Sequence, residues 1–188
     1  MPTSKIILGF VGDLSSGKGT AAKYLKEKYN SNSYRFSTIL RDIINRLYLP
    51  ETRGNLQNIS TVLRENFGQD VLSKVIAEDV KNDPNEIVVV EGVRRPTDIT
   101  YLREIPGFHL IYITAESKLR WERLVKRGEN EDDMEKTYEE FLKDEQAEAD
   151  ILIKELGKSA EYTIYNNLSF EEFYTEIEKI LSEIKSKK

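Results

Sequence analysis

The sequence predicts a three-layer α/β domain with a mostly parallel five-stranded sheet, on three observations. An apolar run over residues 6–11 has the length of a buried strand and leads into a glycine-rich loop. Residues 86–90 and 108–114 form further buried runs, as strands covered on both faces do. Helical patterns separate these strands along the chain, which favours parallel crossover connections.

The glycine-rich loop carries the motif around which the chain is organised. Gly12 and Gly17 are separated by four residues, and Lys18 follows directly. Such glycines let several backbone amides face one anion, the lysine adds a charge, and the next helix begins with its positive end there. The fold class is therefore a P-loop NTPase domain. The predicted nucleotide contacts are Gly12, Ser15, Ser16, Gly17, Lys18, Gly19 and Thr20, and the alternative is a glycine-rich turn without a ligand.

Composition limits the classes of function. The 188 residues suffice for one α/β domain, and the absence of cysteine excludes disulfides, thiolate zinc sites and a cysteine nucleophile. The single histidine, His109, is expected to be structural. A net charge of −5 argues against a broad nucleic-acid surface. With no apolar run near the roughly 18 residues of a membrane span and no signal-peptide pattern, we expect a cytoplasmic protein.

The first half of the chain is predicted to contain a helical acceptor-binding region at about residues 37–82. Residues 17–29 form the first helix and residues 34–36 a short strand. A helix over 39–48 follows, capped by Ser37 and Thr38 and ended by Pro50. Residues 51–82 have two apolar stripes at helical spacing, and these helices, which carry Arg64, are expected to form a wall of the acceptor pocket.

Charged residues follow the strand at 86–90. Glu91 ends this strand, at the sheet edge where open parallel sheets bind ligands, and a carboxylate beside a phosphate loop can orient magnesium through water. Arg94 and Arg95 can reach phosphate oxygens with paired N–H groups. The alternative is that these arginines pair with Asp98 and Glu104 on a helix predicted over 97–104.

The last part of the chain completes a single domain over residues 1–188. Helices are predicted at 115–127 and 136–148 around an acidic turn at 128–135, a strand at 162–165, and a closing amphipathic helix capped by Ser169. Arg123 and Arg127 lie four residues apart on one helical face. The alternative is a solvated basic face that pairs with Glu116 and Glu122.

Several segments resemble adenylate kinase and other nucleoside monophosphate kinases. GKGT, with Gly19 between lysine and threonine, looks like their phosphate loop. FSTILR resembles the start of their monophosphate-binding helix but has Ile39-Leu40 where Gly-Asp is usual, and EGVRRP resembles DGFPR. VEGVRRPTDITYLRE more closely resembles a family of archaeal-type proteins described as adenylate-kinase-related or dephospho-CoA-kinase-like. In that family, segments like LRENFGQDVLSKVIAEDV and DGVR occur in the same order along the chain as here.

The resemblance implies phosphoryl transfer with ATP and Mg²⁺ as cofactors. Lys18 would hold the donor phosphates, with Thr20 and Glu91 serving the metal. A short lid over about 123–148 would close on the donor, and Asn166 or Asn167 would approach its base. The resemblance implies that Arg41 and Arg94 bind the acceptor's phosphate and that Arg123 and Arg127 meet the donor nucleotide. Arg64 and Arg95 are further candidates for acceptor binding from their positions, and the predicted catalytic arginines are Arg94, Arg123 and Arg127.

The predicted function is ATP-dependent phosphorylation of a nucleoside or deoxynucleoside monophosphate, by a monomer or homodimer without nucleic-acid or membrane partners. One alternative is dephospho-CoA kinase, whose hydroxyl acceptor needs a carboxylate base, and Asp13 is the candidate by position. A second alternative is a nucleotide-dependent switch or ATPase without a small-molecule acceptor. The sequence leaves the acceptor base and the choice between ATP and GTP open.

Overall fold

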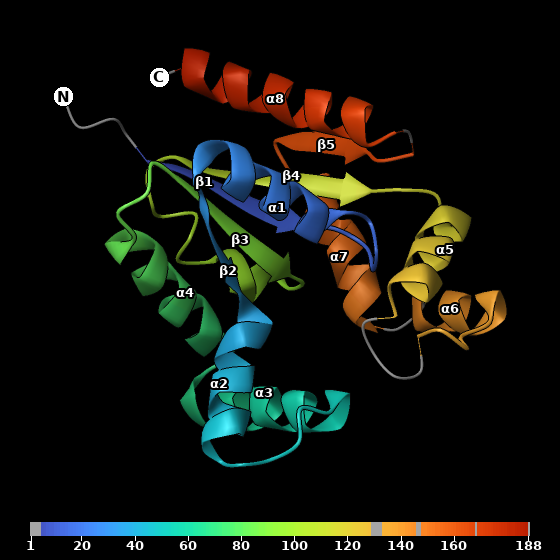
Figure 1. Ribbon diagram of the computed structural model, residues 1–188. Coiled ribbons are helices and arrows are strands. Elements are labelled where there is room, and N and C mark those ends of the chain that lie inside the picture. Colours follow the sequence, from blue (N-terminus) through green and yellow to red (C-terminus); the bar gives the residue numbers. More distant parts are fainter. Residues whose placement is uncertain (1–4, 129–132, 146–147, 168, 188) are drawn as a thin grey trace.

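A computed structural model describes residues 5–128, 133–145, 148–167 and 169–187, and it confirms the α/β fold (Figure 1). All strand pairs are parallel, in the order β2-β3-β1-β4-β5. The strands are β1 (Ile6–Val11), β2 (Asn32–Arg35), β3 (Ile87–Val93), β4 (Phe108–Thr114) and β5 (Tyr162–Tyr165). Because β1 is central, the loop that follows it opens in the middle of the carboxyl edge of the sheet, where such folds bind ligands.

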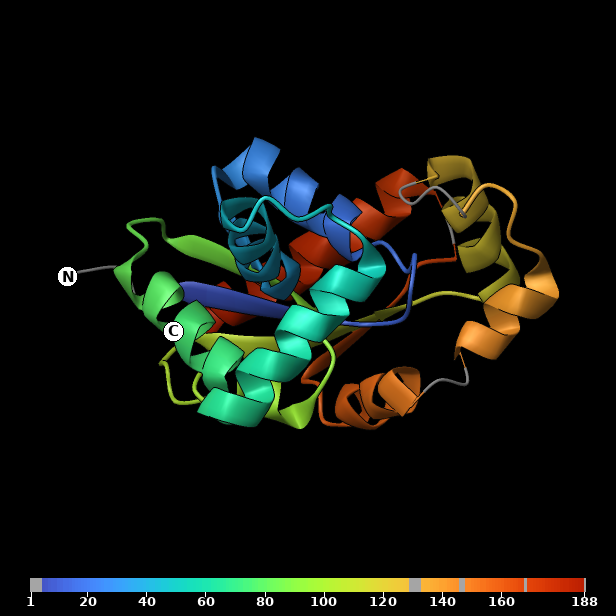
Figure 2. The same ribbon diagram turned by 90° about the horizontal axis from the view of Figure 1, so that it is seen from below.

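Helices lie on both faces of this sheet (Figures 1 and 2). Helices α1 and α8 pack on one face, and α4 and α7 pack on the other. The helices are α1 (Lys18–Tyr29), α2 (Phe36–Arg46), α3 (Arg53–Phe67), α4 (Val71–Asn82), the 3₁₀ turn η1 (Pro96–Ile99), α5 (Ser117–Arg127), α6 (Tyr138–Glu145), α7 (Glu148–Lys158) and α8 (Phe170–Ser186). None of the described helices combines the length and the apolar character needed to cross a bilayer.

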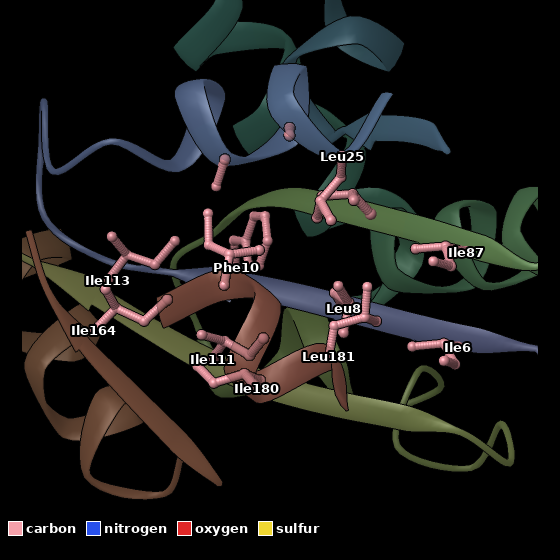
Figure 3. Close-up of a cluster of buried hydrophobic side chains, with 14 of the residues drawn as sticks. Ile6, Leu8, Phe10, Leu25, Ile87, Ile111, Ile113, Ile164, Ile180 and Leu181 are labelled. Carbon is pink, nitrogen blue, oxygen red and sulfur yellow. The ribbon is translucent and has the colours of Figure 1, made fainter. Parts of the chain in front are cut away.

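The core under α1 and α8 explains why β1 is apolar at every position. Leu8 and Phe10 point to this layer, where Leu25 of α1 and Leu181 of α8 contact the sheet (Figure 3). The alternate side chains of β1, such as Ile7, enter the opposite layer under α4 and α7. Burial of each such side chain contributes roughly 1.5–3 kcal/mol, so both layers fix the position of β1 and of the loop after it.

The predicted acceptor wall divides into two parts. Helix α4 buries Leu72, Ile76 and Val80 against the sheet and therefore belongs to the core. Helices α2 and α3 pack on each other beyond the β2 side of the sheet (Figure 1). Helices α5 and α6 lie together on the β4 side (Figures 1 and 2). Two helical pairs therefore flank the carboxyl edge.

Three predicted boundaries are corrected. Helix α2 begins at Phe36, so Ser37 and Thr38 lie in its first turn and do not cap it. Strand β3 continues to Val93, because Glu91 has partners on β2 and is satisfied inside the sheet. The helix predicted over 97–104 is only the 3₁₀ turn η1 followed by turns. Part of the predicted acidic turn, residues 129–132, lies outside the described residues.

Candidate functional site

The phosphate-binding loop joins β1 to α1 at the carboxyl edge of the sheet. Lys18 Nζ donates hydrogen bonds to the carbonyl oxygens of Gly12 and Asp13, each at 2.7 Å. Helix α1 has no side-chain cap at its amino end and no acidic residue in its first turn. The positive end of the helix dipole is therefore open to an anion.

Close packing explains two glycines of this loop. A β-carbon at Gly12 would lie 2.0 Å from the carbonyl oxygen of Ile113. Gly17 has a φ of 112°, and a β-carbon there would lie 2.3 Å from Asn166 Nδ2. This amide donates to the carbonyl oxygen of Ser16 at 2.8 Å. The loop is thus held against β4 and against the segment after β5.

The amine of Lys18 is buried, and charges of both signs act on it. Its pKa is lowered to about 8, first by burial of the amine and next by the charge of Arg94. Arg120 acts in the same direction, while Asp13 and Glu91 partly offset these effects. Because burial and the two arginines disfavour the charged amine, an anion bound beside Lys18 would stabilise its charged form.

Arg120 attaches α5 to this loop, although the sequence did not single it out. Its buried guanidinium donates to the carbonyl oxygens of Leu14 at 3.4 Å and Ala115 at 2.8 Å, and to Glu145 of α6. The three arginines of α5, at positions 120, 123 and 127, were a sequence signal for an anion-binding site on this helix. The partner was not predictable, because Glu145 lies 25 residues further along the chain.

The two arginines predicted to meet the donor differ in burial. Arg127 is exposed in the last turn of α5. Arg123 is partly buried, its Nη1 is buried without a hydrogen-bond partner, and burial lowers the pKa of its guanidinium. The hydroxyl of Ser15, a loop residue with a φ of 58°, is likewise buried without a partner. Buried groups of this kind are costly unless a ligand satisfies them.

The two arginines after β3 are held by their backbone. Asp98 Oδ2 accepts the N–H groups of Arg94 and Arg95, each at 3.0 Å, and both side chains are exposed. Asp98 Oδ1 accepts from Arg64 Nη2 at 2.7 Å. Asp98 therefore fixes the loop without taking the side chains of Arg94 and Arg95, which differs from the alternative considered above.

Arg64, predicted to bind the substrate, is paired inside the structure. Its side chain is 7% exposed, and besides Asp98 it binds the carbonyl oxygen of Gln69. A buried carboxylate needs a cation, and Arg64 supplies it across a separation of 34 residues.

Arg41 is also paired, but near the surface. Its Nε donates to Glu51 Oε2 at 3.1 Å and its Nη1 to Ser37 Oγ at 3.0 Å. Exposed ion pairs contribute only about 0–1 kcal/mol, so a phosphate can replace Glu51 at little cost.

Glu91 is engaged by two residues of β2. Its Oε1 accepts from Ser33 Oγ at 2.7 Å and from Arg35 Nε at 3.1 Å, and its Oε2 accepts from Arg35 Nη2 at 3.0 Å. Thr20, the other predicted metal ligand, lies partly buried in the first turn of α1. The sequence did not indicate Arg35, because only the register of β2 on β3 places it beside Glu91.

The Asp13 carboxylate is occupied below the loop. It is 4% exposed, and its Oδ2 accepts from Thr114 Oγ1 at 2.6 Å and Tyr112 Oη at 3.0 Å. These hydroxyls of β4 position the carboxylate against the sheet. A general base must instead reach the hydroxyl of an acceptor.

The two asparagines after β5 have separate contacts. Asn166 is buried and binds the phosphate loop through Ser16, as described above. Asn167 is exposed, and its Oδ1 accepts from the backbone N–H of Glu116 at 2.8 Å. Asn167 therefore joins the segment after β5 to the start of α5.

The residues of the loop fit the phosphates of a nucleoside triphosphate. The open helix end, the close-packed glycines and the buried, unpartnered hydroxyl of Ser15 all suit an anion with several acceptor atoms. Within the described ranges, no cluster of three or more His, Cys, Asp or Glu side chains could hold a metal. Magnesium would therefore take most of its ligands from phosphates and water, with Thr20 as a protein ligand.

Fold and loop together define a P-loop kinase-like domain. The family model described as "AAA domain" matches residues 11–161. TT1252 from Thermus thermophilus superposes with a TM-score of 0.63 and 19% identity, covering 95% of this chain and 97% of that chain. A shikimate kinase from Acinetobacter baumannii, solved in complex with shikimate, has a TM-score of 0.55 and 16% identity, covering 96% of both chains. At these identities the likeness shows the fold.

Relatives in archaea are more similar in sequence. A UPF0200 protein of Pyrococcus horikoshii is 32% identical, covering 96% of this chain and 98% of the relative. A UPF0200 protein of Methanocaldococcus jannaschii is 31% identical, covering 95% of this chain and 90% of the relative. The chain therefore belongs to the UPF0200 family, and its predicted resemblance to archaeal P-loop kinase-like proteins is confirmed.

Proposed function

We propose that this protein is an ATP-dependent phosphotransferase whose acceptor is the phosphate of a nucleoside or deoxynucleoside monophosphate. The observation that carries the proposal is the phosphate loop with its open helix end, which holds Lys18 and whose Leu14 carbonyl oxygen accepts a hydrogen bond from Arg120. The charge of Arg94 also acts on Lys18 and lowers its pKa. Phosphoryl transfer needs little covalent help from a protein and depends on positioning and on dispersal of negative charge. A cluster of cations around a phosphate loop supplies both.

On the donor side, Lys18 leaves the carbonyl oxygens of Gly12 and Asp13 and binds the β- and γ-phosphates. The loop amides and the Ser15 hydroxyl donate to the same oxygens. Arg123 and Arg127 close over the donor, and Asn167 approaches its base. Removal of one such arginine is expected to lower kcat by a factor of roughly 100–1,000.

On the acceptor side, Arg94, Arg95 and Arg41 hold the phosphate that receives the γ-phosphoryl group. An acceptor oxygen forms the new bond to phosphorus while the bond to the bridging oxygen of ADP breaks, and ADP leaves. Magnesium, when bound, offsets the charge of the phosphates, with Thr20 among its ligands. Closure of α5 and α6 would exclude water and so limit hydrolysis of ATP. We expect such an enzyme in the cytoplasm, where ATP is abundant.

A phosphate acceptor is favoured over a hydroxyl acceptor by the carboxylates. A phosphate oxygen is already ionised and needs no general base, whereas a hydroxyl does. Asp13 is bound by two hydroxyls and nearly fully buried, and Glu91 is paired with Arg35. Neither side chain is presented to an acceptor in this arrangement.

The second candidate is a kinase of a hydroxyl acceptor, as in dephospho-CoA kinase. The likeness to shikimate kinases favours it, since shikimate is not a nucleotide. Under this candidate Asp13 must leave Tyr112 and Thr114 to act as base. Asp13→Asn separates the two: it should abolish phosphorylation of a hydroxyl and spare phosphorylation of a monophosphate. A third candidate, a switch or ATPase that serves another macromolecule, would use the same loop without an acceptor.

The test is a coupled assay of ADP release with ATP and magnesium. The acceptors are AMP, CMP, UMP, GMP, their deoxy forms and dephospho-CoA. Fast turnover with one or a few monophosphates is the expected result. Turnover only with dephospho-CoA would support the second candidate, and slow ADP release that no acceptor stimulates would support the third.

A further inference from the structure

We propose that Arg35 is a ligand of the acceptor's phosphate and that its engagement releases Glu91 toward the metal's water shell. This inference rests on the proposed function, because it concerns the acceptor of the same reaction. It starts from a cavity of about 270 Å³ between α1 and the edge strand β2. The residues that line it are Gly19, Ala22, Lys23, Lys26, Ser33, Arg35, Thr38 and Glu91.

The Arg35–Glu91 pair lies directly against the phosphate loop. The two residues are register partners on parallel strands, and Ser33 adds a second donor to the same carboxylate. A β-carbon at Gly19 would lie 2.9 Å from Arg35 Nη2 and 3.6 Å from Glu91 Oε2. The pair therefore occupies the space that a side chain between Lys18 and Thr20 would fill.

The exposure of the two partners is unequal. The side chain of Glu91 is 6% exposed, whereas that of Arg35 is 46% exposed. Lys23 and Lys26 of α1 add two positive charges to the lining, against the one carboxylate of Glu91. An anion that enters this cavity from solvent therefore meets Arg35 before it meets Glu91.

The geometry of Arg35 suits a phosphate as well as a carboxylate. A guanidinium binds either anion with two parallel N–H groups, so an acceptor phosphate can replace Glu91 as its partner. While Arg35 Nε and Nη2 hold both oxygens of Glu91, this carboxylate cannot also orient the waters of a metal ion. Transfer of Arg35 to the acceptor frees those oxygens, while Ser33 keeps the side chain in place.

This exchange would couple acceptor binding to assembly of the metal site. Without an acceptor, Glu91 is neutralised and ATP bound at the loop lacks one group that orders the metal's water shell. A ligand shifts such an equilibrium only by its differential affinity for the two arrangements, and the coupling is reciprocal. The protein would thereby limit hydrolysis of ATP until the acceptor is present.

The test measures magnesium affinity in a complex that cannot turn over. The protein is saturated with the non-hydrolysable analogue AMPPNP, and Mg²⁺ is titrated by calorimetry with and without inorganic phosphate. For the wild type we expect phosphate to raise the Mg²⁺ affinity at least about fivefold, the lower end of typical coupling between sites. In Arg35→Gln the affinity should be raised without phosphate, and phosphate should add nothing.

Two further variants complete this test. Arg103→Gln is the matched control, since Arg103 is an exposed arginine that binds Ser159 and lines no part of the cavity, and it should keep the phosphate effect. Arg35→Lys retains the positive charge but cannot bind with two parallel N–H groups, so the phosphate effect should be reduced. It also serves as the test variant if Arg35→Gln fails to fold. If AMPPNP binds but phosphate leaves the wild-type Mg²⁺ affinity unchanged, this inference is overturned. If AMPPNP does not bind at all, the proposed function fails with it.

Discussion

The pKa of the Lys18 amine gives a test of phosphate binding at the scale of a single residue. Its pKa of about 8 in the free protein should rise when phosphates bind beside it. Below pH 8 the amine is charged in both states, so nucleotide affinity should be independent of pH. Above pH 8 binding must take up a proton, and affinity should fall by up to about tenfold per pH unit.

Calorimetric titration with ADP from pH 7 to about 9.5, in two buffers of different ionisation enthalpy, checks this prediction. Lys18→Met should bind ADP weakly and show no such slope. A wild-type affinity that stays constant across this range would show that Lys18 does not meet the phosphates.

Asp98 joins two arginine-bearing elements, so its removal should be costly. Asp98→Ala leaves Arg64 buried without its partner and frees the backbone amides of Arg94 and Arg95. We expect a loss of about 3–5 kcal/mol in the free energy of unfolding, measured with urea. Glu104→Ala, an exposed carboxylate close by in sequence, should change it by less than about 0.5 kcal/mol. Similar values for both variants would contradict the bridging role of Asp98.

At the scale of elements, the closing helix α8 has the amino-terminal cap at Ser169 that its sequence predicts. Ser169 Oγ accepts from the N–H of Glu172, and the Glu172 side chain accepts from the N–H of Ser169. Ser169→Ala should lower the free energy of unfolding by about 1 kcal/mol. Thr175→Ala, inside the same helix and exposed, should be nearly neutral. Thermal or urea unfolding of both variants decides whether the cap stabilises α8.

Helices α5 and α6 are joined by the buried Arg120–Glu145 pair and by the rings of Trp121 and Tyr138. Glu145 of α6 receives hydrogen bonds from Arg120, which also binds the phosphate loop. Glu145→Ala should therefore speed amide hydrogen exchange in Tyr138–Glu145 while leaving the strands unchanged. Glu139→Ala, in the exposed first turn of α6, is the control. Unchanged exchange in α6 would show that other contacts hold this helix.

Helices and strands could be predicted where their signal lies in neighbouring residues of the sequence. The apolar strands, the phosphate loop and the amphipathic α8 follow from periodicity and from short motifs. The predicted caps at Ser37 and Thr38 and the helix over 97–104 were wrong, because sheet register and the contacts of Asp98 override local propensity there.

At the scale of the whole molecule, the central place of β1 determines what meets the phosphate loop. The chain passes to β2 and β3 on one side of β1 and to β4 and β5 on the other, so arginines from both halves approach Lys18. The sequence predicted arginines beside the phosphate loop, but it did not predict the internal pairings of the site. Arg35 and Glu91, for example, are 56 residues apart, and only the folded sheet brings them together.

The central claim is that ATP at this loop transfers its γ-phosphoryl group to a nucleotide phosphate. The direct measurement follows label from γ-³²P-ATP during a single turnover with each monophosphate, in wild type and Arg94→Ala. The account predicts labelled nucleoside diphosphate with at least one acceptor, and about 100-fold slower transfer in the variant. Label that appears only as inorganic phosphate, whichever acceptor is present, would contradict it.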